Sequence, residues 1–289
     1  MRDILTSPKA ESLKRMRKKR RLRICILVIV FCAVLVGALA YFSFHPRLTI
    51  SSVVVTGTRI IDAPDVEARV RMDLKGRYFS LFSRANSFIY PRQFIRDDII
   101  ASFPRIETLA VSRDSLSALR ISITERAGSY LYCGSAIPEI EMDIGENCYF
   151  VNDDGYIFDT APYFSGNLFF KYYLAQDPSV LEPLGSQMMD ADRFHELARF
   201  IDKTRTLGFK PIYITLASDG IHTLYLDHVR SDTTPKIIFN ADNDLSVILD
   251  NLSASMSQKE FADEIKNKYT KLLYIDLRFD NKVLYKFNE

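Results

Sequence analysis

The chain is 289 residues long and 47% of them are hydrophobic, which is enough apolar material for one or two packed domains. Its net charge of +2 hides a strong asymmetry. Residues 1–23 contain ten basic and two acidic residues, a net of +8, which leaves −6 for residues 24–289. A mildly acidic bulk argues against a nucleic-acid-binding protein, in which basic residues gather on the folded domain.

One stretch of the sequence has the composition of a membrane span. Residues 24–44 contain no charged residue, and a helix of about 20 apolar residues crosses the hydrocarbon core of a bilayer. Residues 14–23 before it are Lys or Arg at all but two positions, and such clusters stay on the cytoplasmic side. The sequence therefore predicts a cytoplasmic basic tail at 1–23, a transmembrane helix at 24–44 and an extracytoplasmic remainder.

A cleaved signal peptide is the alternative interpretation of this segment. Residues 38–40 are Ala-Leu-Ala, a small-residue pattern of the kind that signal peptidases cut. The apolar stretch nevertheless continues past them to Phe44, and the basic segment before it is long. An uncleaved anchor is therefore favoured.

Residues 48–127 have the pattern of a small α+β domain. A run of β-branched residues ending at Gly57 predicts a strand and a turn. Asp62 and Pro64 are typical of a helix start, because an Asp side chain can accept free N–H groups and proline lacks one. The domain is expected to begin with a strand and a helix.

The second half of this domain continues with a helix and two strands. Residues 75–90 are rich in aromatic residues without a clear period, so a loop or an irregular helix is expected there. After Pro91, a helix is predicted with Phe94, Ile95, Ile99 and Phe103 on one face, ending before Pro104. Strands are predicted at 106–113 and 119–126, which completes a βααββ order.

The sequence pattern of residues 128–289 predicts a mixed, β-rich domain. An Asp-Gly turn flanked by aromatic and β-branched residues predicts a hairpin at 148–158, and the chain closes on a second hairpin at 272–287. Between them, helices are predicted at 192–208, 245–256 and 259–269, and strands at 211–216, 221–226 and 236–239.

The four cysteines divide between the two parts of the chain. Cys25 and Cys32 fall in the predicted membrane helix, where a small apolar residue is the simplest interpretation. Cys133 and Cys148 form a possible disulfide if the compartment is oxidising. The spacing of Cys and His does not indicate a metal site, and the acidic turn at 152–155 lacks the ligand spacing of a calcium loop. No cofactor or metal is expected.

Several stretches occur in an order that resembles the FtsQ/DivIB family of bacterial cell division proteins, which have a membrane anchor, a POTRA domain and a β domain. They span the chain from the anchor almost to its end, and residues 160–190 match least. The stretches are VVVTG at 53–57, FPRIETLAV at 103–111, LRISITER at 119–126, the hairpin at 148–158 and YIDLR at 274–278.

The resemblance implies a non-enzymatic divisome protein of the cytoplasmic (inner) membrane that acts at the septum. It implies that the terminal region pairs with a strand of an FtsB-like protein, in a complex that also holds an FtsL-like protein. Aligned on residues 276–278, the family's contact positions fall on Arg278, Phe279 and Phe287. Val283 and Tyr285 alternate with Leu284 on the last strand and are added as partner-binding residues.

Physical chemistry gives these positions possible roles in partner binding. Arg278 can hold a partner carboxylate through two parallel hydrogen bonds, and the rings of Phe279 and Phe287 can serve as apolar anchors. The last strand is expected at the edge of a sheet, where a partner strand would cover it.

Two other classes of function stay open. One is a POTRA-bearing envelope transport or chaperone component, although the segments after Cys148 are too few and too mixed with helices for a membrane barrel. The other is a membrane-tethered hydrolase that uses His222, Asp227 and His228. The sequence contains no G-x-S-x-G motif and no Gly-rich phosphate loop, so an enzyme is not expected.

Overall fold

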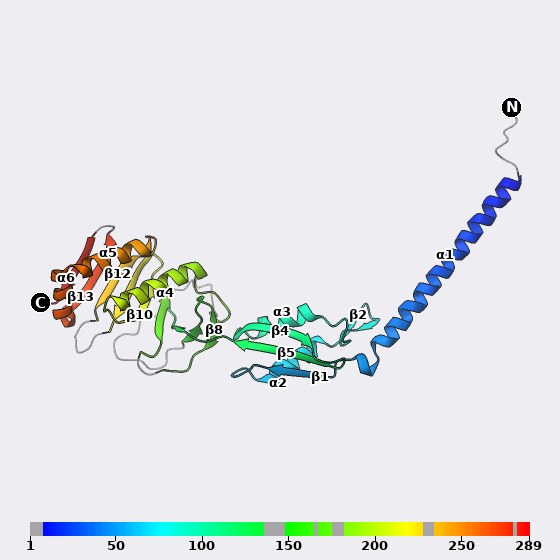
Figure 1. The fold of residues 1–289 in the computed structure, drawn as a ribbon, viewed down its shortest axis with the longest axis horizontal. Coiled ribbons are helices and arrows are strands. Elements are labelled where there is room, and N and C mark those ends of the chain that lie inside the picture. The colour runs from blue at the N-terminus through cyan, green and yellow to red at the C-terminus, as the bar shows by residue number, and fades with distance from the viewer. Residues whose placement is uncertain (1–7, 136–147, 165–166, 175–181, 228–233, 280–281) are drawn as a thin grey trace, which may run out of the picture. The chain divides into compact units, whose positions relative to one another are not determined.

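The computed structural model describes residues 8–135, 148–164, 167–174, 182–227, 234–279 and 282–289, with the side chains of residues 8–15 left aside. The chain forms two compact units, Met1–Glu125 and Arg126–Glu289, whose elements are labelled in Figure 1. The protein is mixed α+β, with one apolar helix near the N-terminus and a large β-sheet in the second unit.

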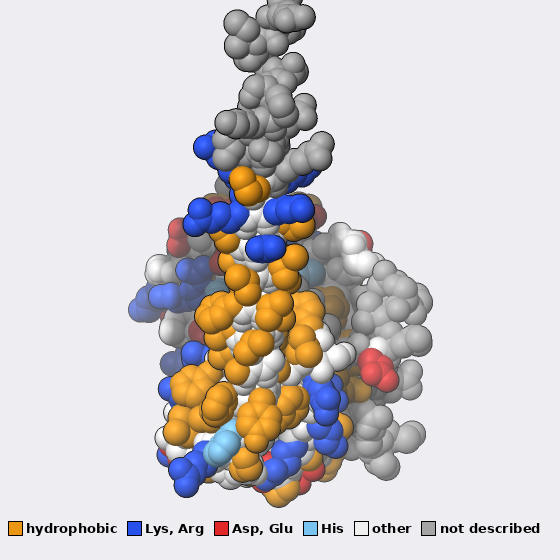
Figure 2. All heavy atoms as spheres, turned by 90° about the vertical axis from the view of Figure 1, so that its right-hand side faces the viewer, with side chains coloured by type: hydrophobic (Ala, Val, Ile, Leu, Met, Phe, Trp, Pro, Cys, Tyr) orange, Lys and Arg blue, Asp and Glu red, His pale blue; other side chains and the backbone are white. Residues whose placement is uncertain are grey.

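Helix α1, Pro8–Ser43, begins the first unit. Its segment Met16–Ser43 is long and apolar enough to cross a membrane, and its most apolar stretch is not buried by the other described residues. Figure 2 shows a stretch of hydrophobic side chains along this helix, with Lys and Arg side chains on either side of that stretch. A membrane anchor and a signal sequence share these properties.

The rest of the first unit is a three-stranded sheet with two helices on it. Its elements are η1 Pro46–Leu48, β1 Ser52–Thr56, α2 Ala63–Asp73, β2 Arg77–Tyr78, β3 Phe82–Ser83, α3 Arg92–Ser102, β4 Ile106–Arg113 and β5 Ala118–Glu125. The strand order is β1-β5-β4, with β1 parallel and β4 antiparallel to β5. Because α2 packs against β1, α3 against β4 and the two helices touch, both cover the same face.

The predicted order of strand, helix, helix, strand and strand is present, but residues 75–90 differ from the prediction. They contain the small antiparallel hairpin β2–β3 instead of a loop or an irregular helix. Its strands are two residues each, so no alternating pattern could develop in the sequence. The hairpin lies between α2 and α3 along the chain.

Two details of the helices also differ from the predictions. Asp62 takes the N-cap position of α2, but its side chain makes no capping hydrogen bond. The second residue of the helix is Pro64, which has no N–H, and the N–H of Asp65 already donates to the backbone carbonyl of Asp62. On α3, Ile95 is buried but Phe94 is 50% exposed, because adjacent helical residues point about 100° apart.

The end of β5 holds the turn that follows β1. One carboxylate oxygen of Glu125 accepts the backbone N–H groups of Arg59 at 2.6 Å, Ile60 at 3.0 Å and Ile61 at 3.1 Å. Burial alone would raise the pKa of Glu125, but the three backbone donors outweigh it and the pKa is lowered. The ionised carboxylate therefore stabilises this turn.

Replacing Glu125 with Gln should lower the free energy of unfolding of the first unit by about 1 to 2 kcal/mol at neutral pH, because charged acceptors give the stronger hydrogen bonds. The pKa is lowered in the folded state, so this stabilisation is present above the pKa of the unfolded chain, about 4.5. It is lost as the pH falls through the lower folded value. Hydrogen exchange at residues 52–61 should therefore separate wild type from E125Q at neutral pH, and the difference should vanish in acid. An equal difference at both pH values would contradict this role.

The second unit is built on a mixed nine-stranded sheet in the order β14-β13-β12-β11-β10-β9-β6-β7-β8. Its strands are β6 Tyr130–Tyr132, β7 Tyr149–Val151, β8 Ile157–Thr160, β9 Phe170–Leu174, β10 Pro211–Leu216, β11 Ile221–Leu226, β12 Lys236–Asn240, β13 Leu272–Phe279 and β14 Lys282–Phe287. Its helices are α4 Ala191–Thr206, α5 Leu245–Ser257, α6 Lys259–Asn267 and the short η2 Tyr269–Lys271. The predicted hairpins, helices and strands are present, whereas β6 and β9 were not predicted.

The three α-helices of this unit lie together on one face of the sheet (Figure 1). The main core between helices and sheet includes Phe194 and Phe200 of α4 and Phe239 of β12. A smaller cluster holds Leu131 and Tyr173, which are next to core-facing residues on β6 and β9 and so lie on the opposite face. The sheet is therefore covered on both sides at β6 and β9.

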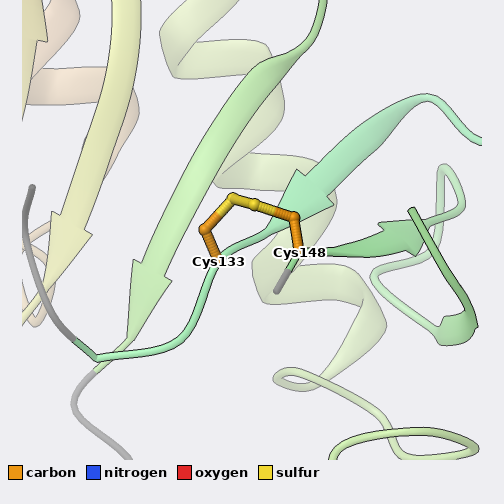
Figure 3. The surroundings of a disulfide bond; sticks show 2 residues. All are labelled: Cys133 and Cys148. Carbon is orange, nitrogen blue, oxygen red and sulfur yellow. A yellow bond between two sulfur atoms is a disulfide. The ribbon is translucent and has the colours of Figure 1, made fainter. Parts of the chain in front are cut away.

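A disulfide joins Cys133, just after β6, to Cys148, just before β7, as Figure 3 shows. Both cysteines are buried in the smaller cluster. The bond closes a loop with a sequence separation of 15, whose residues 136–147 lie outside the described part of the chain. Cys25 and Cys32 of α1 are free and exposed.

Candidate partner-binding edge

The C-terminal hairpin forms one end of the nine-stranded sheet. β13 lies between β12, to which it is parallel, and β14, to which it is antiparallel. β14 is the last strand in the order, so among the described strands only β13 pairs with it, along one of its two flanks. Residues 280–281 of the connecting turn lie outside the described residues.

Side chains on β13 do not alternate strictly. Strict two-residue alternation would place Leu273, Ile275, Leu277 and Phe279 on one buried face, but the structure buries Leu272 together with Ile275 and Leu277. The pairing register with β14 shifts between residues 272 and 274 and again between 276 and 279. Such irregularities interrupt the two-residue alternation, so Phe279 is 49% exposed and Leu273 is half-buried.

Val283, Tyr285 and Phe287 of β14 contact the core or the helices above it. Val283 and Phe287 pack against the main core, and the Tyr285 ring meets the Phe261 ring of α6 edge-on with 5.1 Å between centroids. The rings of Tyr285 and Phe287 also touch, at 5.6 Å. These three predicted contact residues are therefore held within the chain and are only partly open to a partner.

Polar contacts with α6 hold the same face of β14. The Tyr285 hydroxyl donates to Glu264 Oε2 at 2.8 Å, and Lys268 Nζ donates to Glu264 Oε1 at 2.9 Å. The hydrogen bond from Lys268, followed by that from Tyr285, lowers the pKa of Glu264, and the bond to Glu264 raises the pKa of Tyr285. The ammonium group of Lys268 lies 5.4 Å from the Phe287 ring centroid. The edge strand is thus fixed in place before any partner binds.

On the opposite face, Arg278 binds a carboxylate of its own strand. Its Nε donates to Asp276 Oδ1 at 2.9 Å and its Nη2 to Asp276 Oδ2 at 2.6 Å. These hydrogen bonds lower the pKa of Asp276, which is only 5% exposed. The two parallel bonds that the sequence assigned to a partner carboxylate are therefore made within the chain.

Leu284 is the exposed apolar residue that the sequence analysis did not select. It pairs with Asp276 across the hairpin, on the face away from the helices, and is 45% exposed. The sequence contained a sign of this exposed residue. An apolar residue between Val283 and Tyr285 places large side chains on both faces of the strand. Lys282 and Lys286 are also exposed and give the edge a positive charge.

The two ends of the sheet differ in what lies along them. β8 at one end is four residues long, and its first residue, Ile157, exchanges two backbone hydrogen bonds with residues 185–186. β14 at the other end is six residues long, and no backbone group of the described chain bonds to its outer flank. An edge strand with free N–H and C=O groups is a template for pairing with another chain. The β14 edge is the best candidate binding site.

The hydrolase alternative needs His222, Asp227 and His228, of which the structure describes His222 and Asp227. These two residues are not brought together. His222 is the second residue of β11 and faces the core, with its ring edge-on to Phe239 at 5.8 Å. Asp227 comes directly after β11 and five residues after His222, a separation of about 16 Å in an extended chain. Burial lowers the pKa of His222, and its Nδ1 has no hydrogen-bond partner. His228 lies outside the described residues.

The described residues contain no group of three or more His, Cys, Asp and Glu side chains arranged to hold a metal ion. In the turn at 152–155, Asn152 Oδ1 accepts the backbone N–H groups of Asp154 and Tyr156, and Asp154 Oδ1 lies 3.1 Å from His195 Nε2. These polar groups therefore bind one another and connect the turn to α4.

No protein-family model matches this sequence. No curated protein matches it either.

Proposed function

We propose that this chain is a single-pass, non-enzymatic cell division protein of the FtsQ/DivIB type, which recruits and couples septal proteins through its extracytoplasmic units. The observation that carries the proposal is the open flank of β14 at the end of a rigid sheet. Added-strand binding needs such a flank, and the terminal region is where the family resemblance locates the partner strand.

The first helix and the disulfide support the proposed topology. In the proposal, α1 stays uncleaved, the basic residues 1–23 remain in the cytoplasm and both folded units lie outside. A disulfide persists in oxidising compartments and is rare in the reducing cytosol, so the Cys133–Cys148 bond favours this side of the membrane for the second unit. The order of strand, helix, helix, strand and strand in residues 48–125, with the hairpin β2–β3 between the helices, supports a POTRA-like identity for the first unit.

In the proposed complex, a strand of an FtsB-like protein lies along β14 and extends the sheet by one strand. Main-chain hydrogen bonds supply much of the affinity, and side chains at alternate positions supply the selectivity. Leu284 offers an apolar contact on the open face, and Lys282 and Lys286 favour a partner strand that carries carboxylates. An FtsL-like protein joins through the FtsB-like partner.

Replacing Leu284 with Asp should weaken capture of the FtsB-like partner at least tenfold, about 1.4 kcal/mol, because a charge replaces an apolar contact beside the new strand. The measurement is co-purification of the two full-length proteins from membranes. Val247→Asp is the matched control, since Val247 is a 49% exposed apolar residue of helix α5 and is not part of the β14 strand. The control should retain the partner.

Hydrogen exchange at β12 and β13 should be the same in both variants, which separates lost binding from lost folding. Equal capture by L284D, V247D and wild type would remove the β14 edge as the binding site. The division role is tested separately by imaging a fluorescently tagged wild-type copy. A ring at midcell during constriction supports the proposal, and an even membrane signal through the whole cycle argues against it.

A further inference from the structure

The segment between α2 and α3 has the composition of a membrane interface. From Lys75 to Arg92, the first residue of α3, it contains four basic residues and no acidic one, together with seven large apolar or aromatic residues. Aromatic rings and Lys or Arg side chains are the groups that gather where a bilayer meets water. The basic residues are Lys75, Arg77, Arg84 and Arg92, and the apolar ones are Tyr78, Phe79, Leu81, Phe82, Phe88, Ile89 and Tyr90.

The hairpin β2–β3 presents the most exposed large side chain of this segment at its tip. Phe79 is 91% exposed and Leu81 is 48% exposed. Phe79 and Ser80 have φ values of 49° and 61°, and the N–H of Leu81 donates to the carbonyl of Tyr78 at 2.9 Å. A turn with two positive φ values favours Asn-Gly, and a bulky residue there is strained. Backbone strain at a residue with an exposed ring suggests that the ring has a functional role.

Hydrogen bonds fix the hairpin beside the C-terminal end of α1. The backbone N–H of Ser83 donates to Ser43 Oγ at 2.9 Å, and Asn86 Nδ2 donates to the Ser43 carbonyl at 3.1 Å. The guanidinium of Arg77 lies 4.9 Å from the centroid of the Phe44 ring. The hairpin is therefore held beside the C-terminal end of α1, where the apolar stretch of the helix ends (Figure 1).

We propose that residues 77–83 form a membrane-inserting hairpin, which places Phe79 and Leu81 among the lipids of the outer leaflet. The basic side chains Lys75, Arg77 and Arg84 then lie at the level of the lipid phosphates. This rests on the part of the proposed function in which α1 spans the membrane. The hairpin adds a second attachment, which limits how the first unit can swing about the end of the helix.

The chain contains no tryptophan, so a single introduced tryptophan reports its own surroundings. The full-length variant Phe79→Trp is placed in vesicles of phosphatidylethanolamine and phosphatidylglycerol, with or without bromine on the acyl chains. Brominated lipid should remove most of the emission of F79W, because bromine quenches only at contact. Leu81→Trp, which replaces a residue outside the strained positions, should be quenched as well and serves if F79W does not fold.

Two further variants separate the possible outcomes. Ile60→Trp is the matched control, since Ile60 is 64% exposed and lies beyond the far end of β1, so its emission should survive. Phe31→Trp tests α1 itself. If F31W is not quenched, the membrane anchor of the proposed function fails. Quenching of F31W without quenching of F79W and L81W overturns the hairpin insertion alone. Shielding of F79W from brominated lipid and from aqueous iodide would instead assign the ring to a protein contact and would also overturn it.

Discussion

Replacing Gly57 with Ala should lower the free energy of unfolding of the first unit by about 3 kcal/mol. Two costs add up to this value: alanine must adopt a left-handed backbone conformation, and its Cβ meets a steric clash. Gly57 has a φ of +88°, and an added Cβ would overlap the backbone carbonyl oxygen of Ile123 in β5. A backbone oxygen in a paired strand cannot move aside as a flexible side chain can. Hydrogen exchange of the full-length protein, read at β1 and β5, should become much faster.

Gly208→Ala is the matched control for this prediction. Gly208 has a similar φ of +96°, but an added Cβ there meets no atom within 4 Å. Gly208→Ala should therefore lower the free energy of unfolding of the second unit by only about 1 kcal/mol, the cost of the backbone conformation alone. Equal effects at both positions would mean that the contact with Ile123 is relieved at little cost, and that the turn after β1 is softer than its geometry suggests.

Replacing Cys133 and Cys148 together with Ser should destabilise the second unit by about 3 kcal/mol, the chain-entropy value for a loop of this length. The bond joins the ends of β6 and β7, so its loss frees the unfolded chain more than the folded one. Denaturation with and without a reducing agent measures the effect. Reductant should lower the midpoint of the wild-type protein and leave the double variant unchanged.

The free cysteines of α1 supply the control for the disulfide. Cys25→Ser with Cys32→Ser removes both thiols outside the second unit, and this variant should respond to reductant as the wild-type protein does. A wild-type protein whose midpoint is indifferent to reductant would show that the disulfide contributes little. In that case the aromatic cluster around Cys133 and Cys148 would hold this part of the sheet without it.

Element positions were largely predictable where one face of an element is buried and the other is wet. β10 and β11 have the predicted bounds, because Ile214, Leu216, Leu224 and Leu226 face the core in strict alternation. β6 and β9 escaped prediction for the opposite reason. Tyr172 and Tyr173 on β9 are both buried, one on each face, and a strand covered on both sides shows no alternation.

The candidate site was predictable as a place but not as a set of contacts. The terminal hairpin was predicted from its alternation and turn, and β14 does lie at the end of the sheet. The bonds from Arg278 to Asp276 and from Tyr285 to Glu264 depend on rotamers and on the packing of α6, which a sequence pattern does not contain. The shifted register of β13 is equally invisible, because the extra residue looks like any other apolar position.

The unequal ends of the sheet set a limit on stoichiometry. A sheet that is open at both ends can add copies of itself without limit and grow into a fibre. Here β8 is short and its first residue is bonded to residues 185–186, whereas no backbone group of the described residues bonds to the outer flank of β14. If two copies met edge to edge through β14, the outer flank of β14 in each copy would be paired with that of the other. The product would be a closed pair in competition with the partner strand, and assembly would stop there.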